Sequence, residues 1–194
     1  CSADQTPVTV GRSEKMSKSK KNVIDPTQIV EMYGADTARW FVLSDSPPDR
    51  DFEWTNAGAE GAWRFIQKIW RLLSLLPNPS PSAEPVSLFR RTIHKTIAGV
   101  TADIEAFRFN RAIARLYELV NAFSDNITKS DLQEGLETLA QLVQPFMPHL
   151  AEELWQQLGH RQSIMQQPWP KADEALIQEE THVIAIQING KMRD

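Results

Sequence analysis

The chain has 194 residues, of which 41% are hydrophobic, enough for one sizeable domain with attached pieces. Its net charge of −4 at pH 7 and its isoelectric point near 5.6 exclude a protein that coats nucleic acid through general electrostatics. No apolar run approaches the roughly 20 residues of a membrane-spanning helix. The single cysteine, Cys1, excludes an internal disulfide. These properties predict a cytoplasmic protein with no membrane partner.

The first predicted segment, residues 1–56, begins with a basic loop. The run Lys15-Met16-Ser17-Lys18-Ser19 places two ammonium groups three residues apart among small hydroxyl residues. Such a loop suits a polyphosphate ligand, because its positive charge can meet negative charge that grows in a transition state. The alternative interpretation is a solvated basic loop.

Two short helices are predicted after this loop. Asp25 is a candidate N-cap, followed by Pro26 at the first helical position. Gly34 is placed to end this helix, and Asp36 to cap the next one. A proline-rich turn at 46–49 then ends the second helix.

The second predicted segment, residues 57–175, has the periodicity of amphipathic helices. Apolar residues recur three or four positions apart in the stretches 65–76, 93–104, 109–127, 132–146 and 150–158. Ser130 is expected to begin the fourth helix and Gly159 to end the fifth. Four or five such helices predict a helical bundle, so the expected fold class is mainly α. The tryptophans near these stripes, at 54, 63, 70 and 155, are expected in the core.

The third predicted segment, residues 176–194, has a different character. The stretch 181–188 is rich in β-branched residues and is followed by Asn189-Gly190, a strong signal for a two-residue hairpin turn. A short β segment is therefore predicted at the C-terminus, as the truncated start of a further domain. An edge strand of this kind can pair with another copy of the chain, although the chain is expected to be a monomer.

The basic loop and its continuation resemble the second signature of class I aminoacyl-tRNA synthetases, which activate an amino acid with ATP and load it onto tRNA. The residues that carry this resemblance are Lys15-Met16-Ser17-Lys18-Ser19, Asn22-Val23-Ile24-Asp25-Pro26 and Tyr33-Gly34-Ala35-Asp36-Thr37-Ala38-Arg39. The resemblance implies that Lys15 and Lys18 are catalytic residues that hold the ATP phosphates and stabilise the leaving pyrophosphate. It implies that Met16, Ser17 and Ser19 also belong to the ATP-binding loop, and that the full-length enzyme uses ATP and Mg²⁺.

Segments further along the chain are similar to the bacterial leucyl type within this class. They are 46–54, 60–65, 70–72, 109–114, 144–155 and 187–194. The resemblance implies leucine, ATP and tRNA(Leu) as partners, a KMSKS loop with connecting helices over 1–56, an anticodon-binding-type bundle over 57–175, and the start of a C-terminal domain over 176–194. Alternatives are a valyl, isoleucyl or methionyl synthetase, or a non-catalytic helical module that binds tRNA.

Basic residues at helical spacing are candidates for contact with tRNA phosphates. They form two sets: Arg64, Lys68 and Arg71, and Arg108, Arg111 and Arg115. The alternative interpretation for both sets is a solvated helix face. No metal site is predicted, because the 4 histidines and the single cysteine lack the spacing of metal ligands.

The first signature of class I synthetases, a His-x-Gly-His loop, does not occur in this sequence. The nucleotide-binding domain is therefore expected upstream of Cys1, in a longer leucine–tRNA ligase. The basic loop is expected to act only when it closes over ATP held by that domain. The fragment alone is accordingly expected to be inactive and to hold no cofactor.

Overall fold

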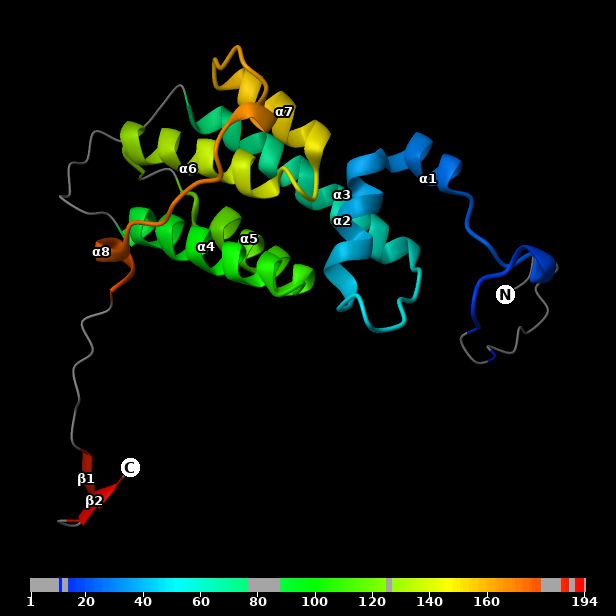
Figure 1. Cartoon of the computed structure of the whole chain (residues 1–194), viewed down its shortest axis with the longest axis horizontal. Helices are drawn as coiled ribbons and strands as arrows, with labels where there is room; N and C mark the ends of the chain where they lie inside the picture. Colours follow the sequence, from blue (N-terminus) through cyan, green and yellow to red (C-terminus); the bar gives the residue numbers. More distant parts are fainter. Residues whose placement is uncertain are drawn as a thin grey trace.

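The computed structural model describes residues 11, 14–76, 88–124 and 127–178, together with two short strands at 186–188 and 191–193. This part of the chain is mainly helical, as the periodicity predicts (Figure 1). The α-helices are α1 (Pro26–Tyr33), α2 (Ala35–Asp45), α3 (Asn56–Arg71), α4 (Leu88–Glu105), α5 (Phe109–Ala122), α6 (Lys129–Val143), α7 (Pro148–Gln157) and α8 (Glu174–Ile177). Short 3₁₀ turns are η1 (Lys18–Lys20), η2 (Leu72–Leu75) and η3 (Ile164–Gln166).

Helix α1 begins and ends where its local signals predict. The Asp25 carboxylate accepts a hydrogen bond from the backbone N–H of Thr27 at 2.9 Å, and Pro26 occupies the first helical position. Gly34 follows the last residue of α1 with φ of 86°, a conformation that favours glycine. These three expectations are confirmed.

The prediction that Asp36 caps its own helix is wrong. The N-cap position of α2 is Gly34, which has no side chain to offer, and Asp36 lies within the first turn. The Asp36 side chain is buried and directs its carboxylate to α7 instead of to the start of α2. A tertiary contact with α7 therefore uses the carboxylate that the local sequence predicted to be a helix cap.

Helices α3 to α7 form the predicted bundle, in which α4 and α5 lie side by side as an antiparallel pair (Figure 1). A helix is present in each of the five predicted stretches, although α5 ends at Ala122, earlier than the predicted 109–127, because Phe123 is extended. Helix α6 begins one residue before Ser130, because Thr128 is its N-cap and accepts a hydrogen bond from the N–H of Asp131 at 3.1 Å. The expectation for Gly159 is confirmed, since it follows α7 with φ of 95°.

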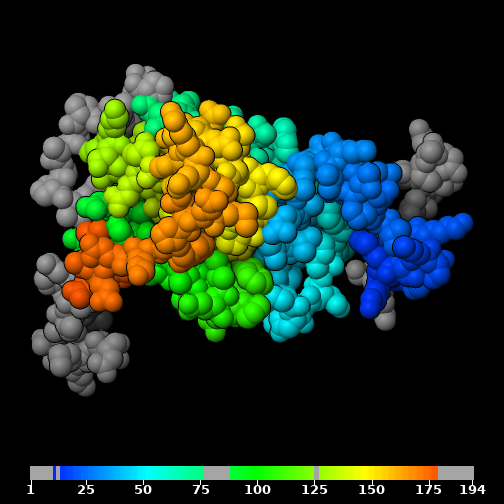
Figure 2. Space-filling view, turned by 45° about the horizontal axis from the view of Figure 1, so that its top comes forward, coloured from blue at the N-terminus to red at the C-terminus, as the bar shows by residue number. Residues whose placement is uncertain are grey.

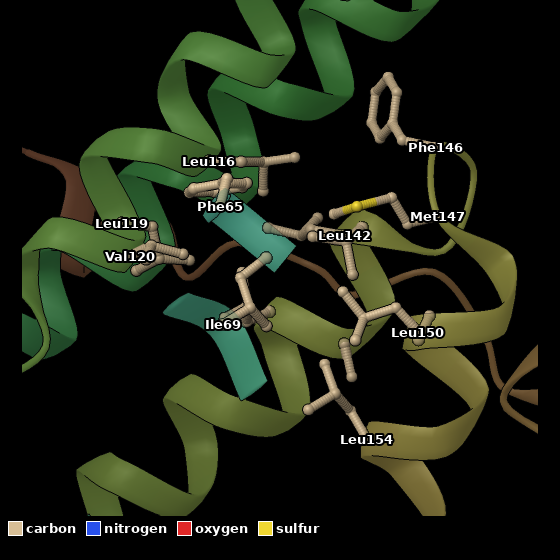
Figure 3. Close-up of a cluster of buried hydrophobic side chains, with 14 of the residues drawn as sticks. Phe65, Ile69, Leu116, Leu119, Val120, Leu142, Phe146, Met147, Leu150 and Leu154 are labelled. Atoms are coloured by element: carbon tan, nitrogen blue, oxygen red, sulfur yellow. The ribbon is translucent and has the colours of Figure 1, made fainter. Parts of the chain in front are cut away.

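The core of the bundle lies where α3, α5, α6 and α7 meet (Figure 3). Helix α2 adds Trp40, which is fully buried and stacks on Phe65 with ring centroids 4.9 Å apart. Its indole N–H donates to the Tyr117 hydroxyl at 3.1 Å. The connecting helices and the bundle therefore share one core, although the sequence predicts a boundary between two segments at position 56.

Two tryptophans expected in the core are instead exposed. Trp63 and Trp70 lie to one side of the buried stripe of α3, which passes through Phe65 and Ile69. Trp155, in contrast, is buried and stacks on His160 with ring centroids 3.7 Å apart. An α-helix has one core-facing stripe, so tryptophans that lie beside this stripe and not within it are partly exposed to solvent.

The C-terminal part of the chain contains α8 and two short strands. Strands β1 (Ile186–Ile188) and β2 (Lys191–Arg193) pair antiparallel, with Ile188 opposite Lys191. The predicted Asn189-Gly190 turn and the stretch 179–185 lie outside the described residues. None of the described helices has the length and apolar character needed to cross a membrane.

Candidate functional site

The basic loop is braced by one side chain, Asn22. Its amide oxygen accepts a hydrogen bond from the N–H of Ser17 at 2.8 Å, and its amide nitrogen donates to the carbonyl oxygen of Lys15 at 3.4 Å. The Ser17 and Ser19 hydroxyls lie 2.7 Å apart and form a further hydrogen bond. Residues 15–19 therefore form a closed loop.

The two lysines of the predicted catalytic pair are both exposed. Among the described residues, neither Lys15 nor Lys18 has a carboxylate within ion-pair distance. Lys20 differs, because its ammonium group lies 2.8 Å from the Glu14 carboxylate. As far as the structure describes the chain, the loop thus presents Lys15 and Lys18 as unpaired cations, whereas Lys20 is paired with Glu14.

A hollow of about 950 Å³ lies beside the loop, between α1, α2 and the stretch 51–54. Lys15 and Met16 form its edge. Its apolar lining comes from Ile24, Pro26, Ile29, Val30, Ala38, Val42, Phe52 and Trp54. Figure 2 shows that this loop-bearing segment, in dark blue, occupies one end of the described molecule. A basic loop therefore borders a large hollow with a mainly apolar lining.

The first set of candidate tRNA contacts lies on the exposed face of α3. Arg64 is 3.8 Å from Glu60 one turn earlier, a solvent-exposed pair of small energetic value. Lys68 donates a hydrogen bond to the side chain of Asn121, and Arg71 is exposed near the end of the helix. With Trp63 and Trp70, these residues give α3 a face that is both basic and aromatic.

The second candidate set is partly engaged inside the protein. The carboxylate of Asp103, which is buried in α4, lies 2.7 Å from Nε of Arg115 and 3.4 Å from Nε of Arg111. Gly99 makes room for this arrangement, because a Cβ there would lie 2.7 Å from the Arg115 side chain. Of this set, Arg108, at the start of α5, and Arg111 are both exposed, and Arg115 is half-buried. These contacts favour a structural role for Arg111 and Arg115, whose contact with tRNA stays a prediction.

The structure keeps the predicted groups apart. The KMSKS loop precedes α1 at one end of the molecule, whereas α5 lies within the bundle (Figure 1). Sequence reasoning missed Asn22 as the brace of the loop, although this residue lies in the motif that follows the lysines. Within the described residues, no three His, Cys, Asp or Glu side chains gather to hold a metal ion.

Comparison with known proteins agrees with both halves of the sequence interpretation. Residues 87–194 match the model of the family described as "Anticodon-binding domain of tRNA ligase". Residues 7–55 match "tRNA synthetases class I (I, L, M and V)". The first match covers the bundle from α4 onward, and the second covers the loop with α1 and α2.

Similar proteins are leucine–tRNA ligases. That of Parvibaculum lavamentivorans is 50% identical over 206 residues, covering 99% of this chain and 24% of its own length. That of Hyphomonas neptunium is 51% identical over 196 residues, covering 96% and 23%. The structure of the ternary complex of LeuRS, tRNA and LeuAMS from Agrobacterium radiobacter is similar with a TM-score of 0.78 and 31% identity, over 92% of this chain and 25% of that one.

The chain spans about a quarter of the length of the curated relatives it matches. Its resemblance to the leucyl type, which the segments downstream of the KMSKS run carry, is confirmed over nearly its whole length. The chain belongs to the anticodon-binding domain family of tRNA ligases, with a class I synthetase segment before that domain and leucine–tRNA ligases as its relatives.

Proposed function

We propose that this chain is the part of a leucine–tRNA ligase that supplies the KMSKS loop and a helical tRNA-binding domain. In the complete protein, leucine reacts with ATP to give leucyl-adenylate and pyrophosphate, and the leucyl group then passes to tRNA(Leu) with release of AMP. The observation that carries the proposal is the pair of exposed lysines, Lys15 and Lys18, in a loop braced by Asn22; neither has an ion-pair partner among the described residues.

The lysines act on charge that moves during the first step. When the bond between the α-phosphorus and the bridging oxygen breaks, negative charge accumulates on the departing pyrophosphate. Ammonium groups of Lys15 and Lys18 that reach these phosphates stabilise the transition state more than bound ATP. Within the described part of the chain, neither lysine has an ion-pair partner that would have to be released first.

ATP itself requires a second surface, which we assign to the part of the class I domain upstream of this segment. The exposed apolar side chains that line the hollow, Val30 and Val42 among them, support a face that this upstream part covers. Both fall within the stretch 7–55 that matches the class I model. Val42→Asp should therefore leave the thermal unfolding of this chain unchanged and destabilise the full-length protein; equal melting of both full-length forms would argue against this contact.

Mg²⁺ is expected to accompany ATP in the full-length enzyme, but no step in this segment is assigned to it. The described residues offer no cluster of carboxylates that fits a divalent ion. Its ligands are proposed to be the ATP phosphates and groups outside this chain.

For tRNA, we propose the exposed face of α3 as a contact surface. Arg64 and Arg71 are exposed there and, among the residues that the structure describes, have no buried carboxylate partner, in contrast to Arg111 and Arg115. Cations of this kind bind phosphates with little disruption of internal contacts. The short β segment after 176 is proposed as the start of a C-terminal domain.

Leucine-dependent exchange of pyrophosphate into ATP, measured with the full-length protein, tests this function. Exchange with leucine, and at most weak exchange with valine, isoleucine or methionine, is the expected result. Exchange that is strongest with one of those other amino acids would assign the chain to another class I enzyme. No exchange with any of them would favour the non-catalytic module. The isolated chain is expected to show none.

A further inference from the structure

Two side chains of helix α2, one turn apart, form hydrogen bonds with the junction between α6 and α7. The Asp36 carboxylate accepts hydrogen bonds from the backbone N–H of Leu150 at 2.7 Å and from Nδ1 of His149 at 2.8 Å. Arg39 donates from Nε to the carbonyl oxygen of Phe146 at 3.0 Å and from Nη2 to that of Pro145 at 2.8 Å. All four bonds fall on residues 145–150, part of which Figure 3 shows beside the core. We call Asp36 and Arg39 the α2 clasp.

The charges of the clasp suit the backbone groups they bind. Leu150 is the third residue of α7, so its N–H has no acceptor within the helix, and a carboxylate at this end also complements the helix dipole. The carbonyls of Pro145 and Phe146 follow the end of α6, where a guanidinium group is the complementary partner. Asp36 is 8% exposed, so its bonds are largely shielded from water.

The position of the clasp gives it a specific mechanical role. Trp40 and Phe41 anchor the middle of α2 in the core, and Thr37 is also buried near the start of the helix. The clasp adds a second anchor near the N-terminal end of α2, which Gly34 joins to α1 and hence to the KMSKS loop. On the other side, α6 and α7 belong to the bundle.

We propose that Asp36 and Arg39 are positioning residues that hold the KMSKS segment in register with the tRNA-binding bundle. The proposal rests on the function proposed above. Leucine activation needs the loop and the upstream domain, whereas charging also needs tRNA, held by the bundle, to reach the same site. Loosening the clasp therefore lowers tRNA charging more than leucine activation.

The test compares Asp36→Asn and Asp45→Asn in the full-length protein. An asparagine at 36 keeps the size of the side chain but replaces one of its two acceptor oxygens by a donor. Asp45 lies on the same helix, is exposed, and bonds only to the neighbouring Ser46 hydroxyl among the described residues. We expect Asp36→Asn to reduce kcat/KM for tRNA charging about tenfold and pyrophosphate exchange by less than about twofold. Asp45→Asn should change neither.

A second variant, Arg39→Lys, tests the proposal without changing the buried carboxylate, whose replacement could cause a folding defect. Arg39 is exposed, and lysine keeps its charge but lacks the fork that binds two carbonyls. The same split between charging and exchange is expected, with a smaller effect. A merely structural role predicts that both activities fall in parallel with the amount of folded protein, and this result would overturn the proposal. The proposal would also be overturned if the variants at 36 and 39 kept the same charging and exchange activities as Asp45→Asn.

The two proposals fail in different ways. If the unaltered full-length protein neither exchanges pyrophosphate with leucine nor charges tRNA(Leu), the proposed function fails and this inference fails with it. If it does both and the clasp variants show no split, only the inference fails.

Discussion

The Asp103 carboxylate accepts a hydrogen bond from Nε of Arg115 at 2.7 Å, which joins α4 to α5. Asp103 is 3% exposed, so this bond replaces the hydration that the carboxylate has in the unfolded chain. The contact therefore affects whether the basic residues on α5 are interpreted as tRNA contacts or as structural residues. Arg115 is held within the fold by this buried carboxylate, which it shares with Arg111.

Removal of this guanidinium should destabilise the fold. We expect Arg115→Met to lower the free energy of unfolding of the chain by about 1–3 kcal/mol, because Asp103 then lacks its shorter ion pair inside the protein. Urea unfolding measures the change. Arg71→Met, at an exposed site on α3, is the control and should change stability by less than about 0.5 kcal/mol. Equal stability of the two variants would contradict the structural role of Arg115.

The brace of the KMSKS loop should matter for rate and not for folding. Asn22→Ala removes both hydrogen bonds that hold the backbone of Lys15 and Ser17. We expect leucine-dependent pyrophosphate exchange by the full-length protein to fall about tenfold, because misplaced lysines stabilise the transition state less well. Gln28→Ala removes another exposed amide a short distance along the chain and should have no effect. Full exchange by Asn22→Ala would show that the loop does not need this brace.

The face of α3 should bind tRNA through charge alone. Replacing Arg64, Lys68 or Arg71 by glutamine is expected to weaken tRNA(Leu) binding and to reduce the slope of log K against log salt by about 0.7–0.9 for each phosphate that is no longer bound. Filter binding at several salt concentrations measures both quantities. Glu60→Gln, which removes the anionic neighbour of Arg64, serves as the opposite control and should not weaken binding. An unchanged slope in all three glutamine variants would place the tRNA-binding surface elsewhere.

Much of the helical fold could be predicted because its signals are local. The apolar period of 109–122 and the Asp25-Pro26 start each depend on residues within a few positions of each other. The same holds for Gly159, whose positive φ ends a helix whatever lies around it. The family could be predicted as well, because the KMSKS run and its continuation form one uninterrupted motif.

The parts that could not be predicted depend on tertiary contacts. The N-cap preference of Asp36 is a local tendency, but its acceptor atoms serve Leu150, 114 residues away. Helical spacing placed Arg111 and Arg115 on one face but could not show that Asp103 lies opposite them on α4. Trp63 and Trp70 are large apolar residues typical of a core, yet they are exposed. The reason is that Phe65 and Ile69 determine which side of α3 is buried.

Lys15 and Lys18 of the KMSKS loop are proposed to act on the phosphates of ATP as leucine is activated. Single-turnover formation of leucyl-adenylate by the full-length protein tests this role, with Lys18→Ala compared with Lys20→Ala. Lys20 is the matched control because its charge is already paired with Glu14. We expect Lys18→Ala to slow adenylate formation about 100-fold or more with little change in leucine affinity, while Lys20→Ala stays near the unaltered rate. Equal rates for Lys18→Ala and the unaltered protein would contradict this role.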